Sequence, residues 1–446
     1  MRYPAYPDYT ATRWPEAGSI PSGWEARRLK FAATCNDEAL PETTDPDYEI
    51  AYVDISSVDL VNGITAVETH SFDEAPSRAR RIVRDGDTIV STVRTYLKAI
   101  APIESPPDNM IVSTGFAVIR PLESVNSRYL GYALQNTAFI DEVVANSTGV
   151  SYPAINPTTL IGLPVSYPED KTEQQQIAAF LDWQTGQIDA LIAKKKELLE
   201  KLKEKRLAVI TQAVTKGLDP TTPLRDSGTP WLGQVPEHWE VRRLKFTASE
   251  PLMYGANEAA ELDDPEFPRY IRITDVKEDG SLHDDTFRSL PPDVAEPYLL
   301  KDGDILLARS GATVGKSFQY LGTWGRAAYA GYLIRLRVDT NVVNARFAYF
   351  FMQSDLYWAC INSTLIQATI QNFSANKYDN INVPIPPLDE QMKIVNQIEK
   401  QKSAIDKQEA ATAQAIVYLT EYRTALITAA TTGKIDVRNV KIGMAA

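Results

Sequence analysis

Two long stretches of the chain, 169–218 and 388–446, repeat apolar residues every seven positions. The first ladder is Leu181, Ile188, Lys195, Leu202 and Val209, and adding 217 to each number gives the second, Ile398, Ile405, Thr412, Leu419 and Leu426. Each ladder is apolar at four positions and polar at its middle one. A seven-residue repeat is typical of helices that pair in a coiled coil. We therefore predict two helices, each on the order of 65 Å long, and we expect Leu191 and Leu198 at the intervening apolar positions of the first.

The rest of the chain has a shorter pattern. Over 20–168 and 235–386, short runs of β-branched and other apolar residues alternate with turn residues and short helical patches. Such alternation is typical of strands in a mixed α/β domain. We predict an α+β chain with four parts: a globular domain at 1–168, a long helix at 169–218, a second globular domain at 219–387, and a long helix with a tail at 388–446.

The two halves repeat each other. The sequence WEARRLKF at Trp24 returns as WEVRRLKF at Trp239, and an Asp-Gly-Asp turn at 85–87 returns at 302–304. This period is far longer than the units of solenoid proteins, so it indicates a duplicated domain with its trailing helix. Two pseudo-symmetric α/β domains joined by two antiparallel helices, which form a coiled-coil spacer, satisfy the pattern. The alternative is that each helix packs along its own globular domain.

The repeated WEARRLKF motif has a structural interpretation. We expect Trp24, Leu29 and Phe31 to anchor the start of the first domain in its core, as Trp239, Leu244 and Phe246 would in the second. The cations between them would be solvated or would contact an acidic partner.

Composition excludes several classes of protein. The chain of 446 residues has a net charge of −12, two cysteines and three histidines. Cys35 and Cys360 are far apart and no histidine stands at metal-ligand spacing, which argues against disulfide frameworks and zinc sites. No basic, apolar leader opens the sequence and no apolar run is long enough to span a membrane. We expect a cytoplasmic protein in which any anion-binding face is local.

Catalytic motifs are missing from the sequence. It contains no G-x-x-x-x-G-K-[ST] or G-x-G-x-x-G phosphate loop and no G-x-S-x-G nucleophile elbow. The repeated Asp-Gly-Asp is a turn before a strand rather than a metal site, because Asp and Gly are turn formers. We therefore assign no catalytic residue and no metal ligand to this chain.

Two repeated loops carry groups suited to DNA. After the Asp-Gly-Asp turn and its strand, the first copy presents Arg94, Tyr96 and Lys98, and the second presents Arg309, Thr313 and Lys316. A second loop pair is rich in hydroxyl and amide groups, with Ser151 and Tyr152 in the first copy and Gln367 and Gln371 in the second. Cations and hydroxyl groups bind phosphates, and Gln can pair with adenine in the major groove. We predict that these residues bind DNA, although a solvated loop explains any one cation equally well.

Two phrases carry a resemblance to a known family. One is DSGTPWLGQVPEHW at 226–239, before the second domain, and the other is VPIPPLDEQ at 383–391, before the second helix; each has a weaker copy in the first half. With these phrases the chain resembles the specificity subunit of Type I restriction–modification enzymes over nearly its full length. Two departures occur in the first half, where the entrance at 19–24 and the run before the helix at 163–168 match the pattern less well.

The resemblance implies a function. Each globular domain would be a target-recognition domain that reads one half of a split double-stranded DNA sequence, and the helices would set the gap and bind two copies of an adenine methyltransferase subunit. The partners would carry S-adenosylmethionine for methylation, and ATP and Mg²⁺ for a restriction motor-nuclease subunit, in a phage-defence system. The chain would hold no cofactor and would not be an enzyme itself. The residues alone leave open a coiled-coil scaffold that binds only proteins and a nuclease that acts alone.

Overall fold

The computed structural model describes residues 3–14, 18–277, 280–366, 372–441 and 443. The chain divides into two compact units. Unit 1 comprises 1–196 and 413–446, and unit 2 comprises 197–412. Each unit contains one globular part and portions of both long helices, α4 (Lys171–Lys216) and α9 (Leu388–Thr431). The predicted α+β class is confirmed.

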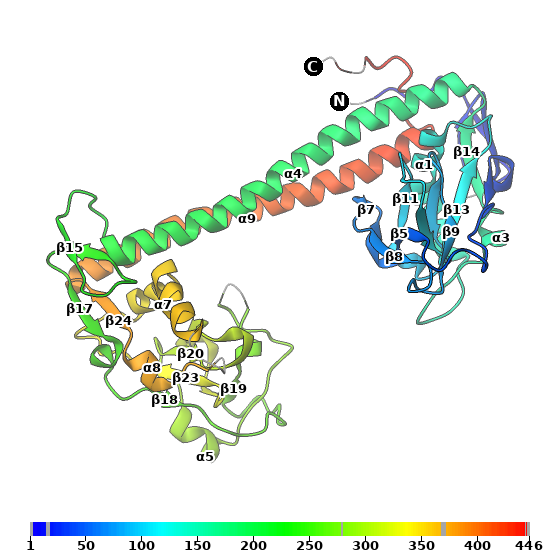
Figure 1. Ribbon diagram of the computed structural model, residues 1–446. Coiled ribbons are helices and arrows are strands. Elements are labelled where there is room, and N and C mark those ends of the chain that lie inside the picture. The colour runs from blue at the N-terminus through cyan, green and yellow to red at the C-terminus, as the bar shows by residue number, and fades with distance from the viewer. Residues whose placement is uncertain (1–2, 15–17, 278–279, 367–371, 442, 444–446) are drawn as a thin grey trace. The chain divides into compact units, whose positions relative to one another are not determined.

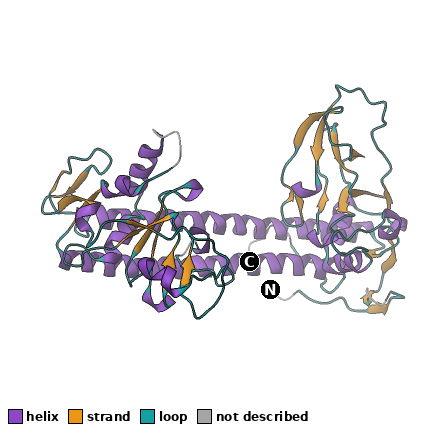
Figure 2. Cartoon of the chain, turned by 90° about the horizontal axis from the view of Figure 1, so that it is seen from below, coloured by secondary structure: helices purple, strands orange, loops and turns teal. Residues whose placement is uncertain are grey.

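The regular elements of the globular part of unit 1 are mostly short strands joined by loops, in contrast to the long helices (Figure 2). Its strands are β1 (Tyr9–Ala11), β2 (Ser19–Pro21), β3 (Trp24–Arg28), β4 (Ala33–Cys35), β5 (Glu49–Val53), β6 (Val58–Asp59), β7 (Gly63–Ile64), β8 (Glu68–Ser71), β9 (Ala79–Ile82), β10 (Thr88–Ser91), β11 (Ile100–Pro102), β12 (Met110–Ser113), β13 (Phe116–Pro121) and β14 (Pro164–Pro168). Its short helices are α1 (Ser127–Gln135), α2 (Thr137–Ala145) and α3 (Pro157–Leu160).

Unit 2 is built from a similar set of elements. Its strands are β15 (Leu224–Asp226), β16 (Gln234–Pro236), β17 (Glu240–Arg243), β18 (Met253–Tyr254), β19 (Arg269–Ile271), β20 (Ile305–Ala308), β21 (Ser317–Gln319), β22 (Ala327–Tyr329), β23 (Leu333–Leu336) and β24 (Asn382–Ile385). Its short helices are α5 (Pro292–Ala295), α6 (Ala345–Phe351), α7 (Asp355–Ile366) and α8 (Ala375–Asp379).

The sheets of the two units correspond strand by strand. The order β11-β10-β13-β4 in unit 1 matches β21-β20-β23-β18 in unit 2, and all neighbours in both sheets are antiparallel. The parallel pair β5–β12 matches the parallel pair β19–β22, although β8 and β9 extend the sheet only in unit 1. The entrance pair β3–β14 matches β17–β24. The sequence repeat is therefore a repeat of topology.

A buried ion pair fixes the predicted Asp-Gly-Asp turn in each unit. Asp87 is 1% exposed and accepts two hydrogen bonds from Arg120, both of 2.9 Å. Asp304 accepts bonds of 2.8 and 2.7 Å from Arg337, which is 217 residues after Arg120. Hydrogen bonds donated to these carboxylates, together with nearby negative charge, raise the pKa of both arginines above the usual value. The turn prediction is confirmed.

The tryptophan of the repeated motif is joined to the start of a long helix in both units. Trp24 Nε1 donates to Glu173 over 2.9 Å, and Trp239 Nε1 donates to Glu390 over 3.1 Å. Both indoles are buried, as are Leu29 and Leu244, which confirms that part of the core prediction.

The prediction was wrong for the two phenylalanines of the motif. Phe31 is 53% and Phe246 is 61% exposed, and each lies under the neighbouring lysine ammonium at 5.1 Å from the ring centroid. Both lie within a short 3-10 helix, Leu29–Phe31 or Leu244–Thr247, in which the leucine is buried and the phenylalanine points outward.

The glutamine after each of these glutamates is fully buried. Gln174 accepts a 2.7 Å bond from Asn126 N, and Gln391 accepts a 2.7 Å bond from Asn344 N. Asn126 and Asn344 are in turn the N-caps of α1 and α6. This repeated Glu-Gln pair therefore ties each long helix to both the entrance strand and the helical layer of its own unit.

The long helices pack against each other within each unit, and their courses can be followed in Figure 1. In unit 1 the buried ladder residues are Leu181, Ile188 and Leu426, with Leu419 half-buried. In unit 2 they are Leu202, Ile398, Ile405 and the polar Thr412, with Val209 half-buried. The antiparallel coiled-coil prediction is confirmed.

The intervening positions were assigned wrongly. Leu191 and Leu198 are each 43% exposed, whereas Thr185, Ile192 and Ala213 are buried. The buried residues follow the ladder by four positions rather than three. The ladder therefore occupies the d rather than the a positions of the heptad, because four residues separate d from the next a.

Ion pairs with the same spacing join the helices in both units. Arg423 donates to Asp189 over 2.9 Å in unit 1, and Arg206 binds Asp406 and Glu409 in unit 2. Asp189 and Arg206 are 17 residues apart on α4, and Asp406 and Arg423 are 17 apart on α9. The equal spacing means that the same alignment of α4 with α9 accounts for both ion pairs, with no extra residue in either helix between them.

The first segment of the chain and its tail meet in unit 1. Asp436 N donates to Pro4 O over 2.7 Å, and the Tyr9 hydroxyl donates to Gly433 O over 2.8 Å. Tyr6 donates to Glu173 over 2.8 Å, at the same carboxylate that holds Trp24. In unit 2 the corresponding stretch, from Gly217 to Trp239, is one continuous piece of chain. Unit 1 therefore joins by hydrogen bonds two segments whose counterparts in unit 2 are covalently connected.

The buried ion pair gives a stability prediction. Arg120→Ala leaves Asp87 buried without its partner, and we expect a loss of about 3 kcal/mol or more in the free energy of unfolding of unit 1. Arg84→Ala is the matched control, because the Arg84 side chain is 64% exposed and pairs with Glu38, while its backbone N–H bond to Asp87 is kept in the variant, so we expect about 1 kcal/mol or less. Urea denaturation measures both variants, and equal losses would contradict the assignment.

Candidate DNA interface

An exposed turn after β10 carries the first set of predicted DNA-binding residues. Arg94, Tyr96 and Lys98 are exposed, while Thr95 between them is buried. Arg94 and Lys98 lie on either side of this single 3-10 turn and both have left-handed backbone conformations, with φ of 49° and 54°. Such conformations are unfavourable for residues other than Gly, and they concentrate at functional sites.

The second predicted loop of unit 1 lies against this turn. The Thr95 and Ser147 hydroxyls are 2.8 Å apart, and Val93 forms a β-bridge with Ala154. The Arg94 guanidinium lies 4.9 Å from the centroid of the Tyr152 ring, which is itself 66% exposed. Ser151 is also exposed. The structure therefore brings together all five residues predicted from the two loops of unit 1, although the sequence separates the loops by about fifty residues.

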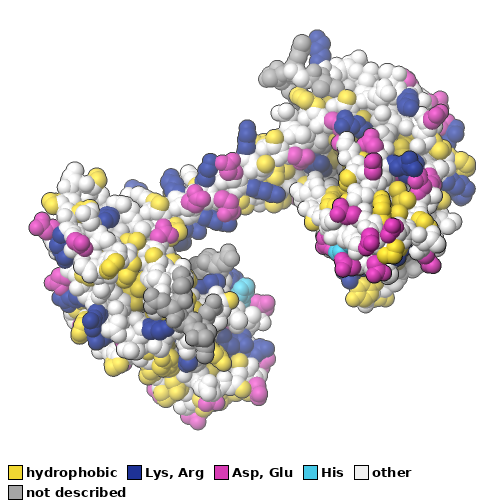
Figure 3. Space-filling view, viewed as in Figure 1, with side chains coloured by type: hydrophobic (Ala, Val, Ile, Leu, Met, Phe, Trp, Pro, Cys, Tyr) yellow, Lys and Arg dark blue, Asp and Glu magenta, His cyan; other side chains and the backbone are white. Residues whose placement is uncertain are grey.

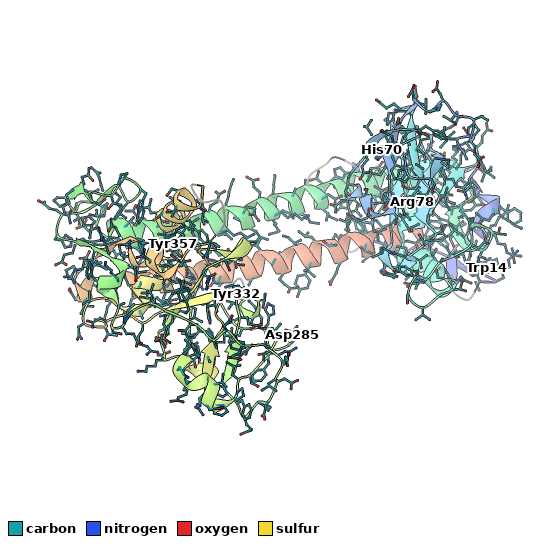
Figure 4. The ribbon with its side chains drawn as sticks, turned by 60° about the horizontal axis from the view of Figure 1, so that its bottom comes forward. Trp14, His70, Arg78, Asp285, Tyr332 and Tyr357 are labelled. Atoms are coloured by element: carbon teal, nitrogen blue, oxygen red, sulfur yellow. The ribbon has the colours of Figure 1, made fainter. Side chains whose placement is uncertain are left out.

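In unit 2 the corresponding loop follows β20. Lys316 is exposed and Thr313 is half-buried. Arg309 is held more tightly than expected, because its guanidinium lies over Tyr254 at 4.9 Å from the ring centroid and is half-buried. The buried Tyr357, labelled in Figure 4, holds this loop by donating to Gly315 O over 2.8 Å. Arg309 and Lys316 therefore differ in freedom, with Lys316 available to solvent and Arg309 largely fixed.

The second predicted loop of unit 2 is described only in part. Gln367 and Gln371 lie outside the described residues. Asn372, the next residue, forms a β-bridge with Ser310, and Phe373 N donates to Arg309 O over 2.7 Å. The described end of this loop therefore meets the loop after β20.

The same backbone hydrogen bonds join the loops in both units. Thr92 N donates to Gly115 O, and Ile155 N donates to Thr92 O. In unit 2, Arg309 N donates to Tyr332 O, and Phe373 N donates to Arg309 O. This pattern makes Gly115 and Tyr332 equivalent positions. It also identifies Tyr254 and Tyr332 as residues of the unit 2 face that sequence reasoning missed, since only long-range contacts place them there.

The segments that build these faces contain no carboxylate. No Asp or Glu occurs in 88–103 or 143–168 of unit 1, or in 305–338 or 356–378 of unit 2. The chain as a whole has 58 acids in 446 residues, so about a dozen would be expected over these segments. The acids lie elsewhere, and in Figure 3 carboxylates of unit 1 gather around the histidine of β8, where Glu68 pairs with His70. A surface that excludes carboxylates within an acidic protein is suited to a polyanion.

Two further features are absent from the described residues. No group of three or more His, Cys, Asp or Glu side chains is placed to hold a metal ion among the described residues. Among these residues, too, no helix is long and apolar enough to cross a membrane.

Comparison with known proteins gives a consistent family. A family model described as the Type I restriction modification DNA specificity domain matches residues 21–203 and again 236–415. The chain is similar to the StySPI specificity subunit of a type I restriction enzyme from Salmonella potsdam, at 25% identity over 63% of this chain and 60% of the relative. It is also similar to the EcoKI specificity subunit from Escherichia coli K12, at 24% identity over 64% of this chain and 60% of the relative. The chain thus spans about 60% of the length of these relatives.

Solved structures share the fold. A chain from a study of complex assembly and conformational transition in the type I R-M system superposes with a TM-score of 0.72 at 22% identity, covering 92% of this chain and 98% of that one. The HsdS subunit from Thermoanaerobacter tengcongensis superposes with a TM-score of 0.53 at 21% identity, covering 93% and 98%.

The strained lysine gives a prediction with two opposite effects. Lys98→Gly removes a cation and also relieves the left-handed backbone, so we expect weaker DNA binding together with a gain of up to about 1 kcal/mol in the free energy of unfolding. Lys98→Ala removes the cation without relieving the backbone, so we expect weaker binding with no gain in stability. Binding titrations at several salt concentrations should show the salt dependence reduced by about one phosphate contact in both variants.

Proposed function

Because the chain belongs to the family of Type I restriction modification DNA specificity domains, we propose that it is a non-catalytic subunit that recognises a bipartite DNA target. Each unit would read one half-site, with an unspecified gap between them. The observation that carries this proposal is a duplicated face built from segments without carboxylates. Each copy combines at least one exposed cation, on the loop after the Asp-Gly-Asp turn and its strand, with aromatic and hydroxyl groups of the same face.

The chemistry of each face divides into two tasks. Lys98 in unit 1 and Lys316 in unit 2 are exposed cations without an ion-pair partner among the described residues, so they suit phosphates, which position the protein without reading sequence. Tyr96, Ser151 and Tyr152 in unit 1, and Thr313 in unit 2, offer hydroxyl groups and rings that suit base edges. Arg94 and Arg309 are partly committed to aromatic rings, which orients their guanidinium groups for bidentate contacts.

The long helices would serve as a spacer. A helix of 46 residues such as α4 is about 70 Å long, and ion pairs join it to α9 within each unit. The length of the helix pair would therefore determine the length of the unspecified gap. The boundaries predicted from the sequence, at 168, 218 and 387, would then separate two target-recognition domains from two spacer helices.

The exposed sides of the helices suit protein partners. Val417, Tyr418 and Tyr422 on α9 are 49%, 62% and 43% exposed in unit 1. In unit 2 a groove of about 530 Å³ runs along the end of α4, lined by residues such as Ala208, Val209 and Gln212. Exposed aromatic side chains are common anchors of interfaces. We propose that two adenine methyltransferase subunits, which carry S-adenosylmethionine, bind to these two exposed helix surfaces. A restriction subunit that uses ATP and Mg²⁺ would join them in a phage-defence complex.

The proposal is tested by co-expressing the chain with its methyltransferase subunit and mapping N6-methyladenine across the host genome. We expect one motif in two parts with a fixed gap. Replacing the globular part of either unit by that of a relative should change one half of the motif and leave the other half and the gap intact. A stable complex that methylates no new sequence would instead support a protein-binding scaffold.

The helix surface gives a separate prediction about partners. Changing both Tyr418 and Tyr422 to Ser should weaken methyltransferase binding about tenfold or more, while DNA binding by the isolated chain stays unchanged. Tyr48→Ser is the control, since Tyr48 is 37% exposed in unit 1 but lies beside β5, away from the helices. Isothermal titration with purified methyltransferase measures the effect, and equal losses in both variants would refute this docking surface.

A further inference from the structure

Unit 2 contains a cavity beside its candidate DNA loop that is not explained by packing. The cavity has a volume of about 300 Å³. Ser310, Thr313 and Tyr332 line one side and come from the carboxylate-free segment 305–338, and Asn257 and Glu258 line the other. Tyr332 is 67% exposed and lies at the same loop junction as Arg309, whose N–H bonds to its carbonyl (Figure 4). The cavity thus opens at the face that we assign to DNA.

The backbone around Glu258 is firmly held, although its side chain is free. The buried Tyr270 hydroxyl lies 2.7 Å from Ala256 O and 3.2 Å from Glu258 O, and Gly331 N donates to Ala256 O over 2.6 Å. The Glu258 side chain is exposed and has no hydrogen-bond or ion-pair partner among the described residues. The Glu258 carboxylate is therefore free to bind a ligand from a fixed backbone position.

Glu258 is also the one uncompensated charge among the residues that line the cavity. Arg272 is the other charged residue of the lining, and its guanidinium is bound by Asp275 at 2.7 and 3.0 Å. A free carboxylate on a phosphate-binding face is repelled by DNA, so it lowers affinity unless it gains a specific hydrogen bond. In the major groove only amino groups of cytosine and adenine can donate such a bond to a carboxylate.

The equivalent place in unit 1 is closed. Gly115 takes the position of Tyr332, and a β-carbon there would overlap the Ile55 side chain and lie 3.3 Å from Val93 Cγ2. Val93 itself takes the position of Ser310, since both form the β-bridge to the second loop. In unit 1, apolar side chains therefore fill the space that in unit 2 is open and lined by polar groups.

We propose that this cavity is a base-reading subsite found in unit 2 but not in unit 1. Glu258 accepts a hydrogen bond from the exocyclic amino group of a cytosine or adenine in the second half-site, and Asn257 and Tyr332 contact the same base edge from either side. The inference rests on the proposed function and adds a specificity determinant to it. It also explains why a carboxylate is tolerated beside segments from which all others are excluded.

The test pairs a protein variant with a DNA variant. Once the wild-type motif is mapped, each cytosine and adenine of the unit 2 half-site is replaced in a synthetic duplex by a base analogue that lacks the amino group. At one position the analogue should weaken wild-type binding about tenfold or more. At that position Glu258→Ala should bind the natural and the analogue duplexes equally, and its affinity for unrelated DNA should rise or stay the same.

Glu261→Ala is the matched control, because it removes an exposed carboxylate three residues away that does not line the cavity. It should keep the full wild-type discrimination. Thermal melting verifies that both variants are folded. If Glu258→Ala discriminates against every analogue as the wild type does, the subsite assignment is wrong. If the wild type itself yields no bipartite motif, the proposed function fails and this inference with it.

Discussion

The architecture depends on a hydrogen-bonded junction at the start of each long helix. Glu173 and Gln174 in unit 1, and Glu390 and Gln391 in unit 2, hold a buried tryptophan on one side and the N-cap of a short helix on the other. Because both glutamines are fully buried, these bonds form away from competing water, where a lost partner is costly. The loops that we assign to DNA are therefore carried by a globular part that is rigidly joined to its helix.

Electrostatics then separates the surface of each unit into regions with different tasks. The chain is acidic overall, which limits non-specific attraction to nucleic acid, but the four segments that build the candidate faces contain no carboxylate. Specificity can therefore come from local contacts rather than from total charge. Some acidic residues on the other surfaces are paired within their unit, as Glu38 is with Arg84 and Arg120.

The sequence predicts the repeat, the long helices, the turn positions and the pairs of candidate loops, because each follows from local periodicity or from matching the two halves. It could not assign the heptad correctly, since a ladder seven residues apart does not say whether its partners follow by three or four, and Leu191 and Leu198 were misplaced for that reason. It also could not show that Phe31 and Phe246 point outward or that Arg309 stacks on Tyr254. These features depend on chain reversals and on contacts between residues far apart in sequence.

The location of the DNA faces is tested most directly by hydrogen–deuterium exchange of the assembled complex with and without its target DNA. We expect slower exchange on DNA binding in the backbone of 92–98 and 147–155 in unit 1, and of 309–316 and 330–333 in unit 2. The acidic surface around β5 and β8 should exchange at the same rate in both samples. Protection confined to that acidic surface or to the helices, with none in these loops, would show that the DNA faces are assigned to the wrong loops.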